Sequence, residues 1–436
     1  MFCKTAEEAP RKNLELHSEF AKKRISPQTG FLHLFTETPS AVEQNTIPLL
    51  ENMYYVLGLF RTRLSDPIIE GKLILEKLLA FEVEGNFPIY LHHFPSCKDR
   101  SLSIHMLPVF YYLLHDYRQV LGKELTRKLE DLTTRIVTHA EKIRAEKPLP
   151  FSAEVKFLSF TKQLIAKLPA SSQEWGEYLL ALRMSEDVFL IQQELKKAAS
   201  FWNSHLGVYI GEGKAHPQDG YFPKATLFDL FMAVQTGAFS EQVLSNHTLC
   251  LSGSLVHAFS PDSLLPFQQD SLAILSHPEG KSRISFFWKE NGHLRSMSVQ
   301  APLGTHTAEK KEQGIKISFT YPEEIPGEEN EVEIGLYLDA SQKVALLVNG
   351  APGSTFALTD TVSIATENSH IPINISFVGE GKLYGQLSKA NRSSQTRKEG
   401  YEAYDWKIGL RTIQRDANLK LSIEMELSEI ETFQVS

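Results

Sequence analysis

The side chains best suited to chemistry gather in one short stretch of the chain, from Phe201 to Tyr221. The stretch offers an amide, two imidazoles, a phenol, a lysine, a carboxylate and a tryptophan ring that could serve as an aromatic platform. Histidine and tyrosine suit proton transfer, and an amide or a cation suits the stabilisation of a developing negative charge. The candidate residues in this stretch are Trp202, Asn203, His205, Lys214, His216, Asp219 and Tyr221.

A structural interpretation of the same residues stands beside the chemical one. Trp202 would end a helix by packing on the core, and Asn203 would cap that end. The histidines would then lie in a polar loop.

A second group of imidazoles is the adjacent pair His92 and His93. Neighbouring side chains on an extended loop point in opposite directions, so such a pair rarely binds one metal ion. A metal site would require His105, His115 and Asp116 to join the pair in space. We therefore expect no metal site, and assign His92 and His93 to substrate binding only.

The sequence lacks the motifs that are typical of several kinds of enzyme. The chain has no phosphate-binding Gly-x-x-x-x-Gly-Lys-Ser/Thr loop, no dinucleotide glycine fingerprint, no His-Glu-x-x-His and no Gly-x-Ser-x-Gly elbow. The formal net charge of −8 argues against nucleic-acid binding, which requires a basic excess to neutralise phosphates. We expect neither a cofactor nor a nucleic-acid partner.

The spacing of apolar residues indicates which elements must position the candidate residues, and this spacing changes near Thr248. Before it, apolar residues recur mainly at helical spacing; Leu125, Leu129, Leu132 and Ile136, for example, form one stripe of an amphipathic helix. Short breaks pair several of the expected helices into hairpins, and residues 1–245 form the expected helical domain. The expected helices cover residues 7–23, 47–62, 67–79, 103–121, 125–143, 153–168, 172–184, 186–202 and 226–239.

From His247 onward the pattern is that of β-strands. Asn291-Gly292 lies between two alternating runs, which is a strong signal for a hairpin. Roughly a dozen such runs, with turns about every 8 to 12 residues, predict an antiparallel β-sandwich over residues 246–436. With 436 residues the chain is long enough for two cores, so the predicted fold class is α+β, multidomain.

Two loops of the helical half look alike, Gly85-Asn86-Phe87-Pro88 and Gly220-Tyr221-Phe222-Pro223. Helical hairpins with such loops, followed by a series of strands, resemble the two-domain polysaccharide lyases of the alginate, chondroitin and heparinase II/III type. The resemblance covers nearly the whole chain at the level of element order. It implies an N-terminal (α/α) toroid-like domain, a C-terminal antiparallel β-sandwich and a cleft at the rim of the toroid, between the two domains.

The resemblance also implies a reaction, β-elimination at a uronic acid. A base removes the proton next to the carboxylate, a neutralising group stabilises the enolate, and an acid protonates the leaving oxygen. On this chain Asn203 would neutralise the carboxylate, His205 would be the base and Tyr221 the acid. The family draws these residues from more widely separated segments. The resemblance assigns sugar binding to Trp202, Lys214, His216, Asp219, His92 and His93.

A second hypothesis shares this architecture without catalysis, as a glycan-binding or protein-interaction protein. The expected partner under the first hypothesis is an acidic glycan. The chain starts without the apolar stretch of a signal peptide, and no run approaches the roughly 18 apolar residues of a membrane span. Cys3, Cys97 and Cys250 do not suggest a disulfide framework. These features predict no membrane partner, and a cytoplasmic protein or one exported without a recognisable cleaved signal peptide.

Overall fold

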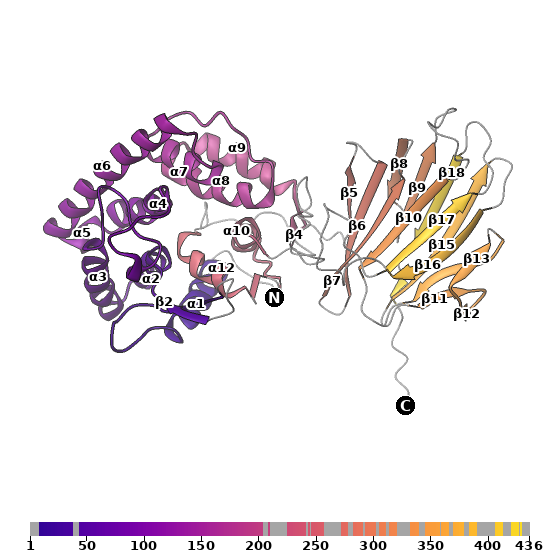
Figure 1. The fold of residues 1–436 in the computed structure, drawn as a ribbon, viewed down its shortest axis with the longest axis horizontal. Coiled ribbons are helices and arrows are strands. Elements are labelled where there is room, and N and C mark those ends of the chain that lie inside the picture. The colour runs from indigo at the N-terminus through magenta and orange to yellow at the C-terminus, as the bar shows by residue number, and fades with distance from the viewer. Residues whose placement is uncertain are drawn as a thin grey trace. The chain divides into compact units, whose positions relative to one another are not determined.

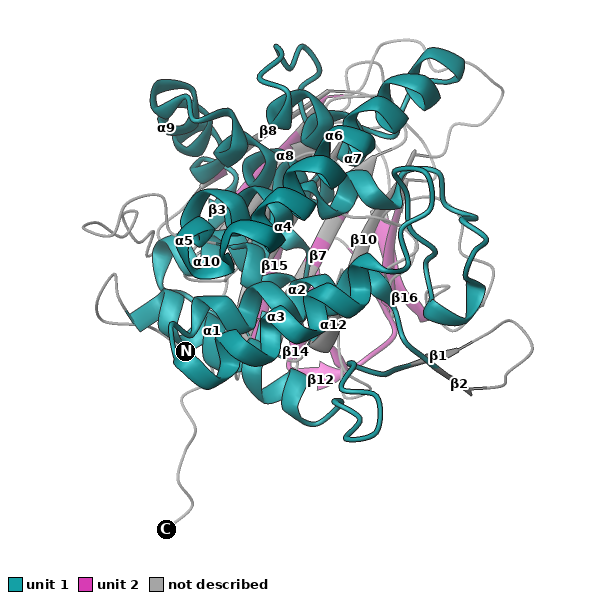
Figure 2. Cartoon of the chain, turned by 90° about the vertical axis from the view of Figure 1, so that its left-hand side faces the viewer, with its two compact units in different colours: residues 1–209, 224–268 teal, residues 210–223, 269–436 magenta. Residues whose placement is uncertain are grey.

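Contacts between elements divide the chain into two compact units, one helical and one made of β-sheets, which Figure 2 distinguishes by colour. The computed structural model describes residues 8–37, 43–203, 208–209, 225–240, 243–244, 246–256, 272–277, 282–290, 293–301, 305–310, 314–320, 332–339, 345–357, 359–365, 369–378, 383–389, 406–412, 420–426 and 428–429.

The first unit contains the helices, most of them in contact with their neighbours along the chain (Figure 1). Two short hairpins, β1 (Leu34–Glu37) with β2 (Glu43–Thr46) and β3 (Trp202–Asn203) with β4 (Val208–Tyr209), accompany them. The helices are α1 (Glu8–Lys22), α2 (Leu49–Arg61), α3 (Ser65–Leu79), η1 (Leu91–His93), α4 (Leu102–Asp116), α5 (Arg118–Leu121), α6 (Lys123–Glu146), α7 (Phe151–Phe160), α8 (Ser172–Ser185), α9 (Val188–Ala199), α10 (Leu227–Thr236), α12 (His247–Ser252) and η3 (Gly253–Leu255).

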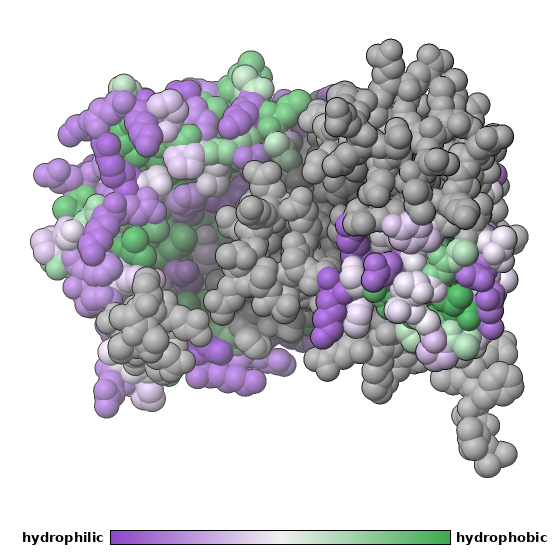
Figure 3. Space-filling model, turned by 45° about the vertical axis from the view of Figure 1, so that its right-hand side comes forward, coloured by the Kyte–Doolittle hydropathy of each residue, from purple (hydrophilic) through white to green (hydrophobic). Residues whose placement is uncertain are grey.

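Helical periodicity explains which faces are buried. The expected stripe of α6 is buried at Leu125, Leu129, Leu132 and Ile136, and α6 packs on α4 with this face. The pairs α2–α3 and α7–α8 are also in contact, as the hairpin pattern predicted. Polar side chains, in purple, cover much of the described surface of this unit on the face shown in Figure 3, with apolar ones in green between them.

The first helix of the unit contacts its last helices. Helix α1 packs against α2, α10, α12 and η3. Asn13 of α1 donates from Nδ2 to the carbonyl oxygen of Gly253 at 2.8 Å, and Nδ1 of His17 lies 3.1 Å from the carbonyl oxygen of Leu251. Both side chains are buried, so these contacts tie the start of the unit to its end.

A glycine allows the closest approach of two helices. A Cβ atom on Gly176 of α8 would lie 2.4 Å from the backbone nitrogen of Phe228 in α10. Helices α8 and α10 are therefore in backbone contact at a position where only glycine fits without a shift. This contact places the start of α10 beside α8.

The structure corrects three expectations for the helical half. The change to strands does not occur at His247, because Asn246 caps a further helix, α12, by accepting a hydrogen bond from the Leu249 backbone nitrogen at 3.1 Å. Helices α12 and η3 thus lie in the first unit, although the sequence boundary at 245 placed them in the second domain. The expected helix 103–121 breaks at Tyr117, and α7 ends at Phe160 rather than at 168.

The second unit consists of antiparallel strands in two sheets (Figure 1). One sheet has the order β13-β16-β17-β10-β7-β6-β5, and the other has the order β12-β11-β14-β15-β18-β9-β8 with β19 paired to β15. The strands are β5 (Leu272–His277), β6 (Ser282–Glu290), β7 (His293–Ala301), β8 (Thr305–Lys310), β9 (Gly314–Thr320), β10 (Val332–Asp339), β11 (Ala345–Val348), β12 (Ala351–Pro352), β13 (Thr355–Ala357), β14 (Val362–Ala365), β15 (Ser369–Val378), β16 (Leu383–Lys389), β17 (Trp406–Thr412), β18 (Lys420–Glu426) and β19 (Ser428–Glu429).

Turn chemistry sets the register of these strands. Glu290 pairs with His293, so β6 and β7 are joined by the two residues Asn291 and Gly292 that predicted the hairpin. Asn349 and Gly350 both have positive φ, 51° and 82°, as a type I′ turn requires, and they join β11 to β12. Strands β12 and β13 are only two residues apart yet belong to different sheets, so the two sheet edges lie close together there.

The chain is therefore a mixed helix-and-sheet protein with its antiparallel sheets in the C-terminal region, in agreement with the α+β prediction. The finer toroid and sandwich assignments stay predictions.

Candidate functional site

A cavity of about 190 Å³ lies in the helical unit, among α2, α8, α10 and α12. Residues of α2 and α8 line it together with the start of α10, both ends of α12 and the end of η3. Leucines and an alanine supply its apolar surface. Its polar lining consists of Tyr54, Gln173, Glu177, Thr226, Asn246 and Ser252.

Two of these polar residues are occupied as helix caps. Thr226 forms a capping box with Asp229 at the start of α10. Asn246 caps α12 and also donates from Nδ2 to the carbonyl oxygen of Ala225 at 3.1 Å. These bonds fix two walls of the cavity and leave little capacity in either side chain for a ligand.

The other uncharged polar groups are available. Within the described part of the chain, the Tyr54 hydroxyl, the Gln173 amide and the Ser252 hydroxyl make no hydrogen bond to protein. Polar groups that face a cavity without a protein partner are the usual means of orienting a bound ligand.

A buried ion pair supports the charged side of the cavity. Lys156 of α7 has a side chain only 2% exposed, and its ammonium group pairs with the Glu177 carboxylate, which is 15% exposed. The Lys156 Nζ also lies 3.0 Å from Nδ1 of His105 in α4. The lysine is thus held between two partners behind the cavity, and Glu177 is positioned at its surface.

Burial sets the protonation of this cluster. Burial, assisted by the charge of Lys156, lowers the pKa of His105 to about 3, so this imidazole is neutral and accepts a hydrogen bond from the ammonium group. Burial and the carboxylates of Glu177 and Glu51 raise the pKa of Tyr54 well above its usual value. Burial also raises the pKa of Glu51. Tyr54 therefore keeps its proton and acts as a hydroxyl donor.

This arrangement favours binding over proton abstraction. Glu177 can accept hydrogen bonds from a ligand, and Tyr54 can donate one. His105 is a poor base, because its Nδ1 already accepts from Lys156 and its pKa is depressed. Proton transfer to or from a substrate would have to come from other residues.

The structure places Trp202 and Asn203 in a packed position near the cavity. They form β3, which pairs with β4, and they are 3% and 5% exposed. The Trp202 ring contacts that of Phe228 at a centroid distance of 6.0 Å, and Phe228 belongs to the first turn of α10. Trp202 therefore has a packing role, and the burial of Asn203 keeps its amide away from a polymer.

Five candidate residues, His205, Lys214, His216, Asp219 and Tyr221, lie outside the described residues. The chain is described again from Ala225, which lines the cavity. Four of the five thus precede a cavity residue closely in sequence.

The histidine pair lies in an aromatic cluster beside the start of α2. His92 and His93 form η1, with ring centroids 4.4 Å apart, and His92 stacks on Tyr90 at 5.7 Å with an interplanar angle of 5°. Backbone hydrogen bonds from Leu49 to Ile89 and from Leu91 to Ile47 attach this segment to α2. The two histidines therefore remain near one another without converging on the cavity lining.

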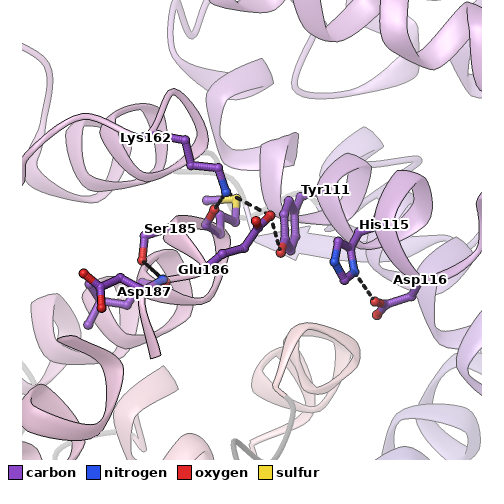
Figure 4. A network of polar contacts seen from close by, with 9 residues as sticks. Tyr111, His115, Asp116, Lys162, Ser185, Glu186 and Asp187 are labelled. Carbon is purple, nitrogen blue, oxygen red and sulfur yellow. Dashed lines mark hydrogen bonds and ion pairs between the residues drawn. The ribbon is translucent and has the colours of Figure 1, made fainter. Parts of the chain in front are cut away.

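A second polar network joins the ends of α4, α7 and α8 (Figure 4). Oε1 of Glu186 accepts a hydrogen bond from the Tyr111 hydroxyl at 3.2 Å and lies 2.9 Å from Nζ of Lys162, which also donates to the carbonyl oxygen of Met184. The His115 ring stacks on that of Tyr111 at 5.3 Å. Because the carboxylate is already satisfied by two protein donors, this network acts as a clamp between helix ends rather than as a ligand site.

Comparison with known proteins adds no assignment. No protein-family model matches this chain, and no curated protein matches it.

Within the described residues, no group of three or more histidine, cysteine or acidic side chains is placed to hold a metal ion. Among the described helices, none combines the length and the apolarity that crossing a membrane requires.

Proposed function

We propose that this chain is a carbohydrate-active protein that binds an acidic glycan through its helical unit and cleaves it by β-elimination. The observation that carries the proposal is the cavity with three available polar groups, on Tyr54, Gln173 and Ser252, beside the carboxylate of Glu177. Hydroxyl and amide groups around a small cavity with apolar patches are suited to a sugar ring, which has both hydroxyls and an apolar face.

The arrangement of elements supports the same proposal. Helical pairs precede antiparallel sheets along the chain, and α1 packs against α10 and α12. Contact between the first and the last helices favours a closed, toroid-like helical unit. The crossing of the chain from β12 to β13 favours two sheets stacked as a sandwich. Architecture alone does not establish an activity, so the site carries the argument.

Within this proposal the proton transfers belong to His205 and Tyr221. Tyr221 precedes the cavity residue Ala225 by four positions in the sequence. Asn203 is buried in the β3–β4 hairpin, so its amide is poorly exposed for neutralising a uronate. Lys214 and His216, in the same stretch as Tyr221, would supply positive charge to the substrate carboxylate.

An activity screen tests the proposal. The full chain is incubated with alginate, heparan, chondroitin and hyaluronan, and the absorbance of the unsaturated product is followed in the short ultraviolet. Tyr221→Phe and His205→Ala should each lower the rate by about 10²-fold or more. Tyr178→Phe is the matched control, because Tyr178 is a buried tyrosine of α8 outside the cavity lining. Absence of product from all four glycans would refute cleavage.

A second candidate function is glycan binding without catalysis. The observation in its favour is the aromatic cluster around η1, where Tyr90 and His92 stack and Phe94 is 45% exposed. Exposed aromatic rings bind sugar faces by stacking, with no need for an acid or a base. Binding of a glycan that is weakened by Phe94→Ala, together with no cleavage in the screen, would favour this function.

A further inference from the structure

The two most exposed large apolar side chains among the described residues belong to neighbouring segments of the helical unit. Leu164, which follows α7, and Phe189, in the first turn of α9, are each 85% exposed, and Val188 beside Phe189 is 59% exposed. A single exposed apolar residue is ordinary on a protein surface, but several on adjoining segments mark a place of interaction. We call Leu164, Val188 and Phe189 the exposed apolar group.

Polar contacts hold the two segments together. Nζ of Lys162 lies 2.9 Å from Oε1 of Glu186 and also donates to the carbonyl oxygen of Met184 (Figure 4). Leu164 follows this lysine by two positions, and Val188 follows the glutamate by two. All three members of the exposed apolar group are therefore within three residues of one ion pair.

The first turn of α9 directs its apolar side chains outward. Asp187 caps this helix by accepting a hydrogen bond from the Leu190 backbone nitrogen at 3.0 Å. Ile191 is only 4% exposed and faces the core, whereas Phe189 lies on the outer face in line with Lys196, seven residues later. The capped helix thus holds the phenyl ring away from the core.

The exposed charges on these segments are mostly positive, although the whole chain has a net charge of −8. The loop 161–170 contains two lysines and no acidic residue, and the only acidic residue of the segment 188–200, Glu194, is buried. The two exposed carboxylates at the turn before α9 are engaged, Glu186 in the ion pair and Asp187 as the helix cap. The exposed lysines are Lys162, Lys167, Lys196 and Lys197.

We propose that the exposed apolar group and these lysines bind the surface of a lipid bilayer that contains anionic headgroups. The apolar side chains enter the boundary between headgroups and acyl chains, to a depth of about 5–10 Å. Lys196 and Lys197 follow Phe189 by about 10–12 Å along the helix axis. Their long side chains can therefore place the ammonium groups at the level of the lipid phosphates.

A bilayer suits this surface better than a protein partner does. A stable protein interface buries about 800 Å² on each partner in a contiguous, complementary patch, whereas these apolar side chains project from a loop and from the start of a helix. A fluid lipid layer accepts projecting side chains without a matching pocket. The sequence predicted no membrane partner because no run of residues could span a bilayer, but contact with the surface requires no such run.

Sedimentation of the full chain with vesicles tests the proposal. One set of vesicles contains equal parts of phosphatidylcholine and phosphatidylglycerol, and the other contains phosphatidylcholine alone. The chain should bind the anionic vesicles at least about tenfold more tightly, and high salt should reduce this preference. Phe189→Ala and Leu164→Ala should each weaken binding to the anionic vesicles by about tenfold. Leu73→Ala is the matched control, because Leu73 of α3 is 56% exposed and lies outside the exposed apolar group.

A double variant tests the charge argument. Each lysine near an anionic membrane surface contributes about fivefold to binding, so Lys196→Gln/Lys197→Gln should weaken binding to the anionic vesicles by about 20-fold or more. It should leave the weaker binding to the neutral vesicles unchanged. Lys142→Gln/Lys147→Gln, which removes two exposed lysines at the end of α6, is the control and should change neither. All these positions are exposed, so every variant should keep the circular dichroism spectrum of the wild type.

The outcomes decide between a bilayer and another partner. Equal binding to the two sets of vesicles, no binding to the anionic set, or anionic binding that Phe189→Ala and Leu164→Ala leave unchanged overturns the proposal. A dimer that Phe189→Ala dissociates in analytical ultracentrifugation, together with no vesicle binding, would make the exposed apolar group a contact between two copies of the chain and would also overturn it. The proposal does not depend on glycan cleavage, so neither result of the glycan screen changes these outcomes.

Discussion

Removing the charge of Glu177 should destabilise the helical unit more than removing the charge of its partner Lys156. Lys156 is 2% exposed, whereas Glu177 is 15% exposed and borders the cavity. In Glu177→Gln the ammonium keeps only Nδ1 of His105 as a strong acceptor. In Lys156→Met the carboxylate can be hydrated from the cavity, and the new side chain is apolar.

The magnitudes can be bounded. Breaking a buried ion pair by removing one partner costs about 3–5 kcal/mol. A buried ammonium without a counterion can instead lose its proton, and for lysine, with an ordinary pKa of about 10.4, this limits the cost to about 4.6 kcal/mol at pH 7 and about 1.9 kcal/mol at pH 9. Glu177→Gln should therefore lower the free energy of unfolding by about 3–4.6 kcal/mol at pH 7 and by less than about 2 kcal/mol at pH 9. Lys156→Met should cost about 1–2 kcal/mol at either pH.

Urea unfolding followed by circular dichroism at 222 nm measures these values. The signal reports on the helical unit, because the described α-helices all lie there. The double variant Lys156→Met/Glu177→Gln should be more stable than Glu177→Gln alone by about 1–3 kcal/mol. Glu124→Gln, which breaks an exposed pair with Lys128, is the control and should leave the transition midpoint unchanged. Equal costs for the two single variants, or a cost for Glu177→Gln that does not fall at pH 9, would refute the reasoning.

Two further predictions concern stability. Burial lowers the pKa of His105 to about 3 and the pKa of His17 to about 4. As the pH falls, the unfolded chain therefore takes up protons on these histidines before the folded protein does. The stabilisation from each neutral histidine is complete above about pH 6.5, and about 3 kcal/mol of it per histidine is lost by pH 4. His17→Asn should roughly halve the acid dependence of the urea midpoint between pH 7 and pH 4, and an unchanged dependence would contradict this account. Gly176→Ala should lower the free energy of unfolding by more than about 2 kcal/mol in the same assay, because the new Cβ would collide with the backbone of α10. The control Gly122→Ala meets no atom within 4 Å but has a φ of +85°, so it should lower the free energy of unfolding by about 1 kcal/mol. Similar values for the two variants would argue against the close α8–α10 contact.

The spacing of apolar residues predicted those helices of which one face packs against the core. The apolar stripe of α6 is an example, because its period is a property of the segment itself. The break of the expected 103–121 helix at Tyr117 was not predictable in this way. The Tyr117 ring packs on Phe60 of α2 at a centroid distance of 5.4 Å, and that contact depends on how two helices meet. The short helix α12 was missed because six residues are too few to distinguish helical from strand periodicity.

The candidate site was likewise predictable only where a local sequence signal exists. The sequence directed attention to the stretch before Ala225, which adjoins the cavity in the chain, and to His92 and His93, which lie beside α2. It did not identify Tyr54, Gln173 or Glu177, because tyrosine, glutamine and glutamate are common within helices and no motif distinguishes these three.

One local signal could have led to the cavity. Lys156 lies between Val155 and Phe157 in the predominantly apolar segment Phe151–Phe160. A charge in a helix that is buried on most of its surface requires a partner, because an uncompensated ammonium in the core is strongly unfavourable. The sequence could thus predict that a carboxylate or an imidazole must face this lysine. It could not predict that the partner would be Glu177. The packing of α7 against α8 brings this carboxylate to the lysine, and the packing of α7 against α4 brings the imidazole of His105. The burial of Lys156 therefore requires an ion pair, and tertiary packing determines that the carboxylate of this pair borders the cavity.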